Sequence, residues 1–202
     1  MDFIDISKMR VTVRKYSDKK VDPKKLEKIL EAGRWAPTAV NYQPQRILVL
    51  DTPENLVKVK EFSTFDYDKK YAEIAHECVN ETKDKNIYYY GAPLVLFVCY
   101  DKTVCWQHPQ TGKRSGETDA NIVTTHMMLE AASLGLGTVW ISYFDTEKAR
   151  KLLNVPDDLV PVCMLAIGYP ADDFRPNPTM SGKRMPLNKT VFYNKYSEDS
   201  MK

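Results

Sequence analysis

Short apolar runs recur along the chain, and the segments between them repeat their apolar residues at helical spacing. Residues 46–50 and 94–100 are rich in β-branched and aromatic side chains, which is typical of strands. The second run is almost continuously apolar, the pattern of a strand covered on both faces. Two later runs, 139–143 and 160–167, bring the prediction to four strands in the body of the chain.

Helical segments lie between these runs. Asp22 followed by Pro23 makes a helix start, and Pro37 sets a stop. Leu26 and Ile29 lie on the apolar face of that helix. Further helices are predicted at 53–62 and 146–153, and the polar region 63–86 is expected to be helical in part.

Residues 118–134 leave hardly any polar stripe, so this helix is predicted to be buried all round. A chain of this length rarely wraps one helix so completely, and we infer that a second copy supplies part of the covering. His126 lies on this helix, where a hydrogen-bonded core or interface histidine is the favoured interpretation. The alternation of helices and strands predicts an α+β layer sandwich.

The composition of the chain limits the classes of function that it could have. The 202 residues suit one domain, with 43% hydrophobic and 28% charged residues. A net charge of +2 offers no large field for binding nucleic acid. The first residues lack a basic and apolar leader, and no apolar run approaches the ~20 residues that span a bilayer. We therefore expect a cytoplasmic protein with neither nucleic-acid nor membrane partners.

Cysteine and histidine spacing indicates neither a disulfide framework nor a bound metal. No Cys-x-x-Cys pair occurs, and no histidine stands at zinc-finger spacing. Cys99 and Cys163 fall in apolar runs, where a free cysteine is a small buried hydrophobe. The scattered residues concerned are Cys78, Cys99, Cys105, Cys163, His76, His108 and His126.

The chain begins with a basic segment, residues 10–16, in which Arg10, Thr12 and Arg14 alternate. In extended backbone the three side chains would point the same way. Arginine matches phosphate oxygens with a planar fork of donors. A solvated surface segment is the simpler alternative for so short a stretch. Sequence signatures of Rossmann dinucleotide sites, phosphate loops and zinc proteases are absent from the chain.

Three further segments stand in the order of a known family. They are Ala-Pro-Thr-Ala-Val-Asn-Tyr-Gln-Pro-Gln at 36–45, Ser-Leu-Gly-Leu-Gly-Thr-Val-Trp-Ile at 133–141 and Lys-Arg-Met-Pro-Leu at 183–187. With the basic segment, they resemble the nitroreductase-like family of FMN-dependent oxidoreductases over about residues 3–187. The resemblance implies a single domain, 1–202, with a three-layer sandwich, a central mostly antiparallel sheet flanked by helices, and an intertwined homodimer.

The resemblance also implies where FMN binds. The basic segment and a C-terminal arginine would hold the phosphate and ribityl chain, and the segment after the first helix would meet the flavin from the partner subunit. The backbone around Ser142 and Tyr143 would lie beside the reactive flavin nitrogen, so no catalytic side chain is required. The implied cofactor-binding residues are Arg10, Val11, Thr12, Arg14, Pro37, Thr38, Ala39, Asn41, Gly137, Thr138, Ser142 and Arg184.

Some of these residues have simpler explanations. Asn41 suits an ordinary turn after a proline stop, and Gly135 suits a helix end in the left-handed conformation. Gly137 is better explained if backbone approaches a flat ligand closely, because glycine has no Cβ. The chain departs from the family at Val11, where many relatives carry Arg or His, and around Ser142, where a glycine is common. Lys85 and Asn86 do not align securely with a polar and basic pair of the family.

The segment 101–117 is expected to cover the flavin and to choose the acceptor. Trp106 and His108 would line the substrate pocket, since tryptophan can stack on an aromatic acceptor. A long surface loop is the alternative interpretation. The sequence does not distinguish nitroaromatic, quinone, enone or halogenated phenol acceptors, because fold analogy does not fix substrate.

Three hypotheses for function follow. The first is a homodimeric FMN enzyme in which NADH or NADPH reduces the flavin, leaves, and is replaced by a small oxidised acceptor in ping-pong order. The second is a non-catalytic FMN-binding dimer for storage or redox sensing. The third, a basic module for acidic polymers, is disfavoured because lysines 19–25 are interleaved with acids.

The C-terminal tail, 190–196, is aromatic and β-prone. It is predicted to be a strand seeking a sheet edge. In relatives such an extension crosses to the partner's sheet, and residues 188–202 are therefore expected to contact the partner subunit.

Overall fold

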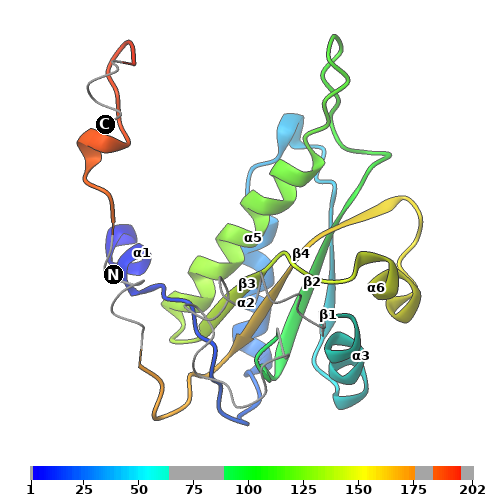
Figure 1. The fold of residues 1–202 in the computed structure, drawn as a ribbon, viewed down its shortest axis with the longest axis vertical. Coiled ribbons are helices and arrows are strands. Elements are labelled where there is room, and N and C mark those ends of the chain that lie inside the picture. The colour runs from blue at the N-terminus through cyan, green and yellow to red at the C-terminus, as the bar shows by residue number, and fades with distance from the viewer. Residues whose placement is uncertain (1, 64–88, 176–183, 197–202) are drawn as a thin grey trace, which may run out of the picture.

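A four-stranded sheet forms the centre of the protein in a computed structural model that describes residues 2–63, 89–175 and 184–196. Its strands are β1 (Gln45–Leu50), β2 (Leu94–Asp101), β3 (Gly137–Ile141) and β4 (Leu159–Gly168). They lie in the order β1-β2-β4-β3, and all neighbours are antiparallel (Figure 1). The four strands predicted from apolar runs are confirmed. β3 begins and ends two residues earlier than expected, because Gly137 already pairs with Gly168.

The alternation of side chains along β2 explains its continuous apolar run. Leu96 and Val98 pack into one core, whereas Val95 and Phe97 pack into the other. Successive side chains of a strand point to opposite faces of the sheet, so a strand covered on both faces needs apolar residues at every position. Residues 94–99 are accordingly all buried.

Helices cover both faces of the sheet. α2 (Pro23–Arg34) and α5 (Gly116–Ser133) pack against each other on one face, and α3 (Pro53–Ser63) pairs with α6 (Thr146–Leu153) on the other (Figure 1). Asp22 caps α2 by accepting from the backbone N–H of Lys24 at 2.8 Å, and Asp145 caps α6 in the same way. The three-layer α+β sandwich is confirmed.

α5 differs from its prediction in two respects. It begins at Gly116 rather than at 118, and a Cβ at Gly116 would lie 2.1 Å from the ring of Tyr100, so only glycine fits this first turn. Its other end agrees with the sequence, since Gly135 adopts φ +74°. In the single chain the helix is not buried all round, because Ile122, His126 and Leu129 are only half-buried.

The N-terminal segment was only partly anticipated. Residues Phe3–Met9 form α1, which has no buried residue and therefore left no clear apolar stripe in the sequence. Beyond it the chain runs extended along the edge of β3, where Thr12 forms a parallel bridge with Thr138. Val13 N–H donates to the carbonyl of Thr138 at 2.9 Å. The N-terminus thereby covers one edge of the sheet.

The predicted tail strand is wrong for the chain by itself. The described part of the tail contains a short 3₁₀ turn, Leu187–Lys189, followed by irregular backbone to Tyr196. It projects from the layers beside α1 (Figure 1), and Tyr193 is 85% exposed. A strand requires a partner edge to satisfy its backbone groups, and none lies beside the described tail residues.

The cysteine prediction is confirmed for the described residues. Cys99 and Cys163 are buried and unbonded to each other. Burial raises the pKa of each thiol to about 12. Both thiols therefore stay protonated at neutral pH and act as core side chains. Cys78, and all but the first residue of the polar region 63–86, lie outside the described residues.

Candidate functional site

The basic segment lies beside β3, as an extended stretch after α1. Val13 is buried, with 1% of its surface exposed, and packs against Gly137. Because side chains alternate in extended backbone, Thr12 and Arg14 point away from that packing contact. Val11 is half-buried in the same stretch. The bridge from Thr12 to Thr138 is consistent with extended backbone here, and the shared direction of the Thr12 and Arg14 side chains stays a prediction.

Two guanidiniums from opposite ends of the chain influence each other here. The pKa of Arg10 is lowered, first by burial and then by the positive charge of Arg184. Like charges held close together favour an anion between or beside them. Arg184 follows the segment 176–183, which lies outside the described residues together with Lys183 of the predicted motif. The pair fits a phosphate group.

Arg14 supplies a further donor. Its Nε atom is buried and has no hydrogen-bond partner in the described structure. The guanidinium carbon stands 5.7 Å from the centroid of the Tyr90 ring, which holds the side chain by a cation–π contact. An unpaired buried donor is costly, and a phosphate or ribityl oxygen would remove that cost. Tyr90 carried no sequence signal, because its role depends on a contact far along the chain.

Gly137 has a packing reason for its missing side chain. A Cβ there would lie 2.4 Å from Cγ2 of Val13, closer than packed atoms approach. The sequence analysis attributed this glycine to a flat ligand that approaches the backbone, whereas within the chain the close partner is the side chain of Val13. Thr138, the next residue, is buried and forms the bridge with Thr12. A small pocket of about 170 Å³ lies alongside, lined by Arg10, Val11, Val13, Gly137, Thr138 and Phe174 among others.

The residues after β3 lie open to solvent. Ser142 is exposed, and its Oγ accepts a hydrogen bond from the indole N–H of Trp140 at 2.9 Å. Tyr143 is 52% exposed. Both residues are therefore exposed, although neither is the glycine that is common here in the family.

The segment 38–43 forms a strained turn after α2. Three of its residues adopt left-handed backbone, Val40 at φ +53°, Asn41 at +57° and Gln43 at +50°. A β-branched residue in this region is uncommon and costs on the order of 1–3 kcal/mol. Thr38 Oγ1 accepts from the backbone N–H of Gln43 at 3.1 Å, and Ala39 N–H donates to Asp119 at 2.9 Å. Pro37 is exposed just before this turn.

The predicted cofactor residues fall into two groups at opposite ends of α5. Arg10 and Gly137 border one pocket with Gly135, at the C-terminal end of the helix. Ala39 is bonded to Asp119 in the first turn. The 18 residues of α5 span about 27 Å at 1.5 Å per residue. One chain therefore does not bring the turn 38–43 to its own basic segment.

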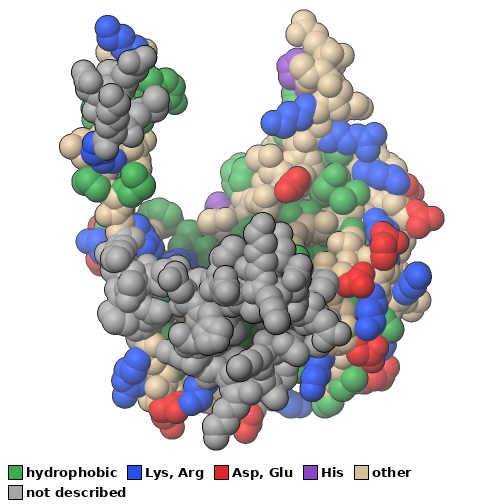
Figure 2. Space-filling view, in the orientation of Figure 1, with side chains coloured by type: hydrophobic (Ala, Val, Ile, Leu, Met, Phe, Trp, Pro, Cys, Tyr) green, Lys and Arg blue, Asp and Glu red, His purple; other side chains and the backbone are tan. Residues whose placement is uncertain are grey.

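The segment 101–117 contains a projecting hairpin at residues 106–115. Gln107 pairs with Arg114, and Ser115 N–H donates to the carbonyl of Trp106 at 2.9 Å. The rings of Trp106 and His108 meet edge-on, with centroids 5.7 Å apart, and both side chains are half-buried. Backbone amides of the hairpin tip donate to His108 Nδ1 at 3.2 Å. The hairpin rises beyond α5, and a hollow with apolar side chains on its floor separates it from the tail (Figures 1 and 2).

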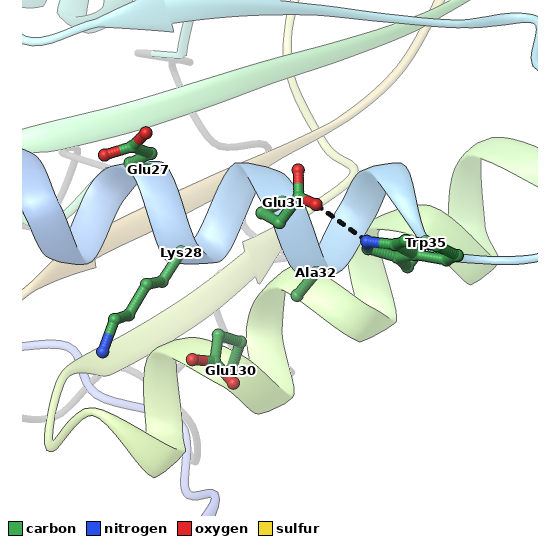
Figure 3. A pocket seen from close by; sticks show the side chains of 6 residues that line it. All are labelled: Glu27, Lys28, Glu31, Ala32, Trp35 and Glu130. Carbon is green, nitrogen blue, oxygen red and sulfur yellow. Dashed lines mark hydrogen bonds between the residues drawn. The ribbon is translucent and has the colours of Figure 1, made fainter.

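A larger surface pocket lies between α2 and α5 and has the wrong charge for a phosphate. It measures about 430 Å³. Three carboxylates, those of Glu27, Glu31 and Glu130, surround it (Figure 3). Glu31 accepts from the indole of Trp35 at 2.7 Å and pairs with Arg34. These contacts, with the side chain of Arg34 first, lower the pKa of Glu31 to about 2.

Comparison with known proteins identifies the family. The model of the nitroreductase family matches residues 8–169, which include the basic segment, the turn 38–43 and β3. The chain belongs to the nitroreductase family. The resemblance inferred from the four sequence segments is thereby confirmed.

Solved members of the nitroreductase family share the fold. A nitroreductase family protein from Clostridium difficile 630 is 35% identical, with a TM-score of 0.81, over 97% of this chain and 100% of that one. An FMN-dependent nitroreductase from Clostridium difficile R20291 has a TM-score of 0.69 at 24% identity, over 96% of this chain and 99% of that one. Among the sequence relatives, an NADPH-dependent oxidoreductase from Staphylococcus haemolyticus is 25% identical, over 97% of this chain and 74% of the relative.

Two features of the described residues bear on other site types. They contain no group of three or more histidine, cysteine or acidic side chains that could hold a metal ion. Among the described helices, none has the length and apolar content needed to cross a bilayer.

Asp119 is the functional candidate that the sequence reasoning missed. It is 2% exposed and binds the turn 38–43, although it lies far along the chain. An acid at the start of a helix whose later turns are largely apolar was the available signal.

Proposed function

We propose that the protein is an FMN-dependent oxidoreductase that uses NADH or NADPH to reduce a small oxidised acceptor, such as a nitroaromatic or a quinone. The observation that carries the proposal is the cationic site formed by Arg10 and Arg184, with the unpaired Nε of Arg14 beside β3. Family membership and the FMN-dependent relative of the same fold support this cofactor.

The phosphate end of FMN would bind to the basic segment. A phosphate carries close to two negative charges, and several cationic donors are needed when it is partly desolvated. Arg10, Arg14 and Arg184 would supply them, and the hydroxyl of Thr12 would add a neutral donor. Binding would also offset the two causes that lower the pKa of Arg10, burial first and then the positive charge of Arg184.

The ring end would require a second copy of the chain. The turn 38–43 lies at the far end of α5 from the basic segment of its own chain, so a turn from a partner could meet the flavin instead. The proposed assembly is a homodimer with two FMN sites at its interface. Pro37, Thr38, Ala39 and Asn41 would then contact the ring and ribityl chain bound to the partner.

When bound, FMN would supply hydride transfer between the nicotinamide and the acceptor, in two half-reactions of ping-pong order. The protein's part is to bind and orient. Backbone N–H groups near Gly137, Ser142 and Tyr143 would direct fixed dipoles at the ring. No side chain acts as acid, base or nucleophile in this proposal.

Acceptor choice would rest on the hairpin 106–115. Trp106 and His108 form an edge-on pair that offers an aromatic surface. Such a surface favours flat aromatic acceptors by stacking. The half-burial of Trp106 leaves part of its ring for that contact.

The test is an anaerobic titration of the full-length protein with FMN, followed by NADH or NADPH and then by an acceptor. The wild type should acquire a flavin spectrum that bleaches on reduction and recovers with the acceptor. Arg184→Ala should raise the Kd for FMN at least about tenfold, because it removes a charged hydrogen bond. Arg175→Ala is the matched control, since Arg175 is exposed and, among the described residues, donates to the nearby backbone carbonyls of Asp172 and Phe174.

The outcomes separate the hypotheses. Flavin that binds without bleaching would contradict the enzyme and favour storage or sensing. Failure of the wild type to bind FMN would overturn the assignments of Arg10, Thr12, Arg14 and Arg184 together. Equal affinities of the Arg184→Ala and Arg175→Ala variants would remove Arg184 from the site.

A further inference from the structure

Asp119 is a buried carboxylate in the first turn of α5. Only 2% of its surface is exposed. Burying a carboxylate is costly unless its oxygens are hydrogen-bonded. The N-terminal end of a helix also stabilises a negative charge. An acid can therefore occupy this position, but an apolar residue would fill the core without the need for hydrogen-bond partners.

Each oxygen of Asp119 binds a different segment of the chain. Oδ1 accepts from the backbone N–H of Ala39 at 2.9 Å, and Oδ2 accepts from the hydroxyl of Ser115 at 2.7 Å. Ser115 in turn donates its backbone N–H to the carbonyl of Trp106 at the root of the hairpin. One carboxylate thus joins the turn 38–43 to the hairpin 106–115.

The turn needs such an anchor because its backbone is strained. Val40, Asn41 and Gln43 all have φ between +50° and +57°. Unfavourable backbone persists where surrounding contacts over-determine it. Within the turn Thr38 binds Gln43, whereas the bond to Asp119 ties the turn to the body of the protein.

We propose that Asp119 is a positioning residue that fixes the turn 38–43 and the root of the hairpin 106–115 in one arrangement. The consequence for the cofactor rests on the proposed function, in which the turn meets the flavin and the hairpin meets the acceptor. A single carboxylate then sets the spacing between the cofactor contact and the acceptor contact. Loss of Asp119 disturbs both.

Three variants of the full-length protein separate positioning from simple stability. Asp119→Ala removes both hydrogen bonds. Asp119→Asn is the conservative variant, because its amide oxygen can still accept from Ala39 N–H. Thr124→Val is the matched control: Thr124 is fully buried on the same helix, and its hydroxyl donates to the carbonyl of Ala120 rather than to the turn.

The primary measurement is residue-resolved hydrogen exchange of the protein without cofactor, normalised to the global stability of each variant. Asp119→Ala should speed exchange of the Ala39 amide at least about tenfold, because that amide loses its acceptor. Asp119→Asn should restore most of the protection. Thr124→Val should leave the turn unchanged even though the variant is less stable.

FMN titration is the second measurement. The Kd should rise about tenfold in Asp119→Ala and by no more than about threefold in Asp119→Asn. If Asp119→Ala fails to fold, Ser115→Ala replaces it; this variant should loosen the hairpin root while Ala39 stays protected.

The proposal is overturned if the turn exchanges equally in the Asp119→Ala and Thr124→Val variants. It is also overturned if Ser115→Ala leaves the exchange of the hairpin root unchanged. Failure of the proposed function has a different signature, in which the wild type does not bind FMN while the exchange results stand.

Discussion

Gly137 and Val13 show how one missing side chain positions the basic segment. The space that a Cβ of Gly137 would need is filled by the Val13 side chain, and the backbone of Val13 can therefore bond to Thr138 at 2.9 Å. Thr12 and Arg14 take their directions from this contact, since they flank Val13. The glycine thus acts on the proposed phosphate site through packing.

Gly137→Ala is expected to destabilise the protein by about 1–3 kcal/mol, because the added methyl group overlaps Val13. Val13→Ala removes the Cγ atoms at 2.4 and 2.9 Å but keeps the Cβ at 2.7 Å, so the double variant should recover part of the loss and be more stable than the sum of the two single effects. Denaturant unfolding of the four proteins measures this coupling. Strictly additive free energies would show that the two residues do not share the contact.

The residue-scale predictions from the sequence succeeded where the cause is local. Gly135 was predicted to close a helix, and a left-handed φ at the end of a helix depends only on neighbouring residues. The role of Asp119 was missed because it depends on a hydrogen bond from Ala39, which is distant in sequence. The charge interaction of Arg10 with Arg184 came from the family resemblance, since spacing within one segment does not predict it.

At the scale of elements, the hairpin 106–115 is almost independent of the core. Beyond Ser115, which binds Asp119 at its root, the hydrogen bonds of the hairpin run between its own residues, as in the bond from His108 N–H to the carbonyl of Lys113 at 2.9 Å. It projects beyond α5 (Figure 1). Such an element can change without loss of the fold, which suits a segment that selects ligands.

Replacing residues 108–113 by a two-residue Asn-Gly turn is expected to leave the fold and the FMN affinity intact. The KM for aromatic acceptors should rise by up to about tenfold, because a stacking surface is lost. Steady-state kinetics with one aromatic and one non-aromatic acceptor measures the effect. Gln110→Ala at the hairpin tip is the control, and an unchanged KM for both acceptors would contradict a role in acceptor binding.

Elements with a continuous apolar pattern were predicted well, and those that bury little in one chain were not. β2 was recognised because residues 94–99 face two cores. α1 was missed because no side chain of Phe3–Met9 is buried. The tail 190–196 carries a strand pattern, but a strand forms only beside an edge that pairs with it.

Within one chain the proposed cofactor residues form two separate groups, and in a dimer each group would be one half of a different site. The turn 38–43 and the basic segment lie at opposite ends of α5, whose 18 residues span about 27 Å. Ile122 and Leu129, on the same helix, are only half-buried. A second copy would complete both sites and cover this helix.

Deleting residues from Asn188 onward should weaken dimerisation at least about tenfold, because exposed apolar side chains at an interface centre carry much of its energy. Tyr193 and Tyr196, which the deletion removes, are 85% and 76% exposed in the single chain, so the fold of each subunit should survive. Sedimentation velocity over a range of concentrations measures the change. A protein that ends at Tyr196 is the control, and a shortened protein that stays a tight, flavin-loaded dimer would refute the assignment of the tail.

The bridge between Thr12 and Thr138 also determines when the site can exist during synthesis. The ribosome releases the basic segment among the first residues of the chain, yet its pairing partner on β3 emerges only after two thirds of the protein has been made. Contacts between such distant residues form late in folding. The nascent chain therefore carries the backbone of its basic segment unpaired until β3 arrives, and the capacity to hold a cofactor is one of the last properties that the growing polypeptide acquires.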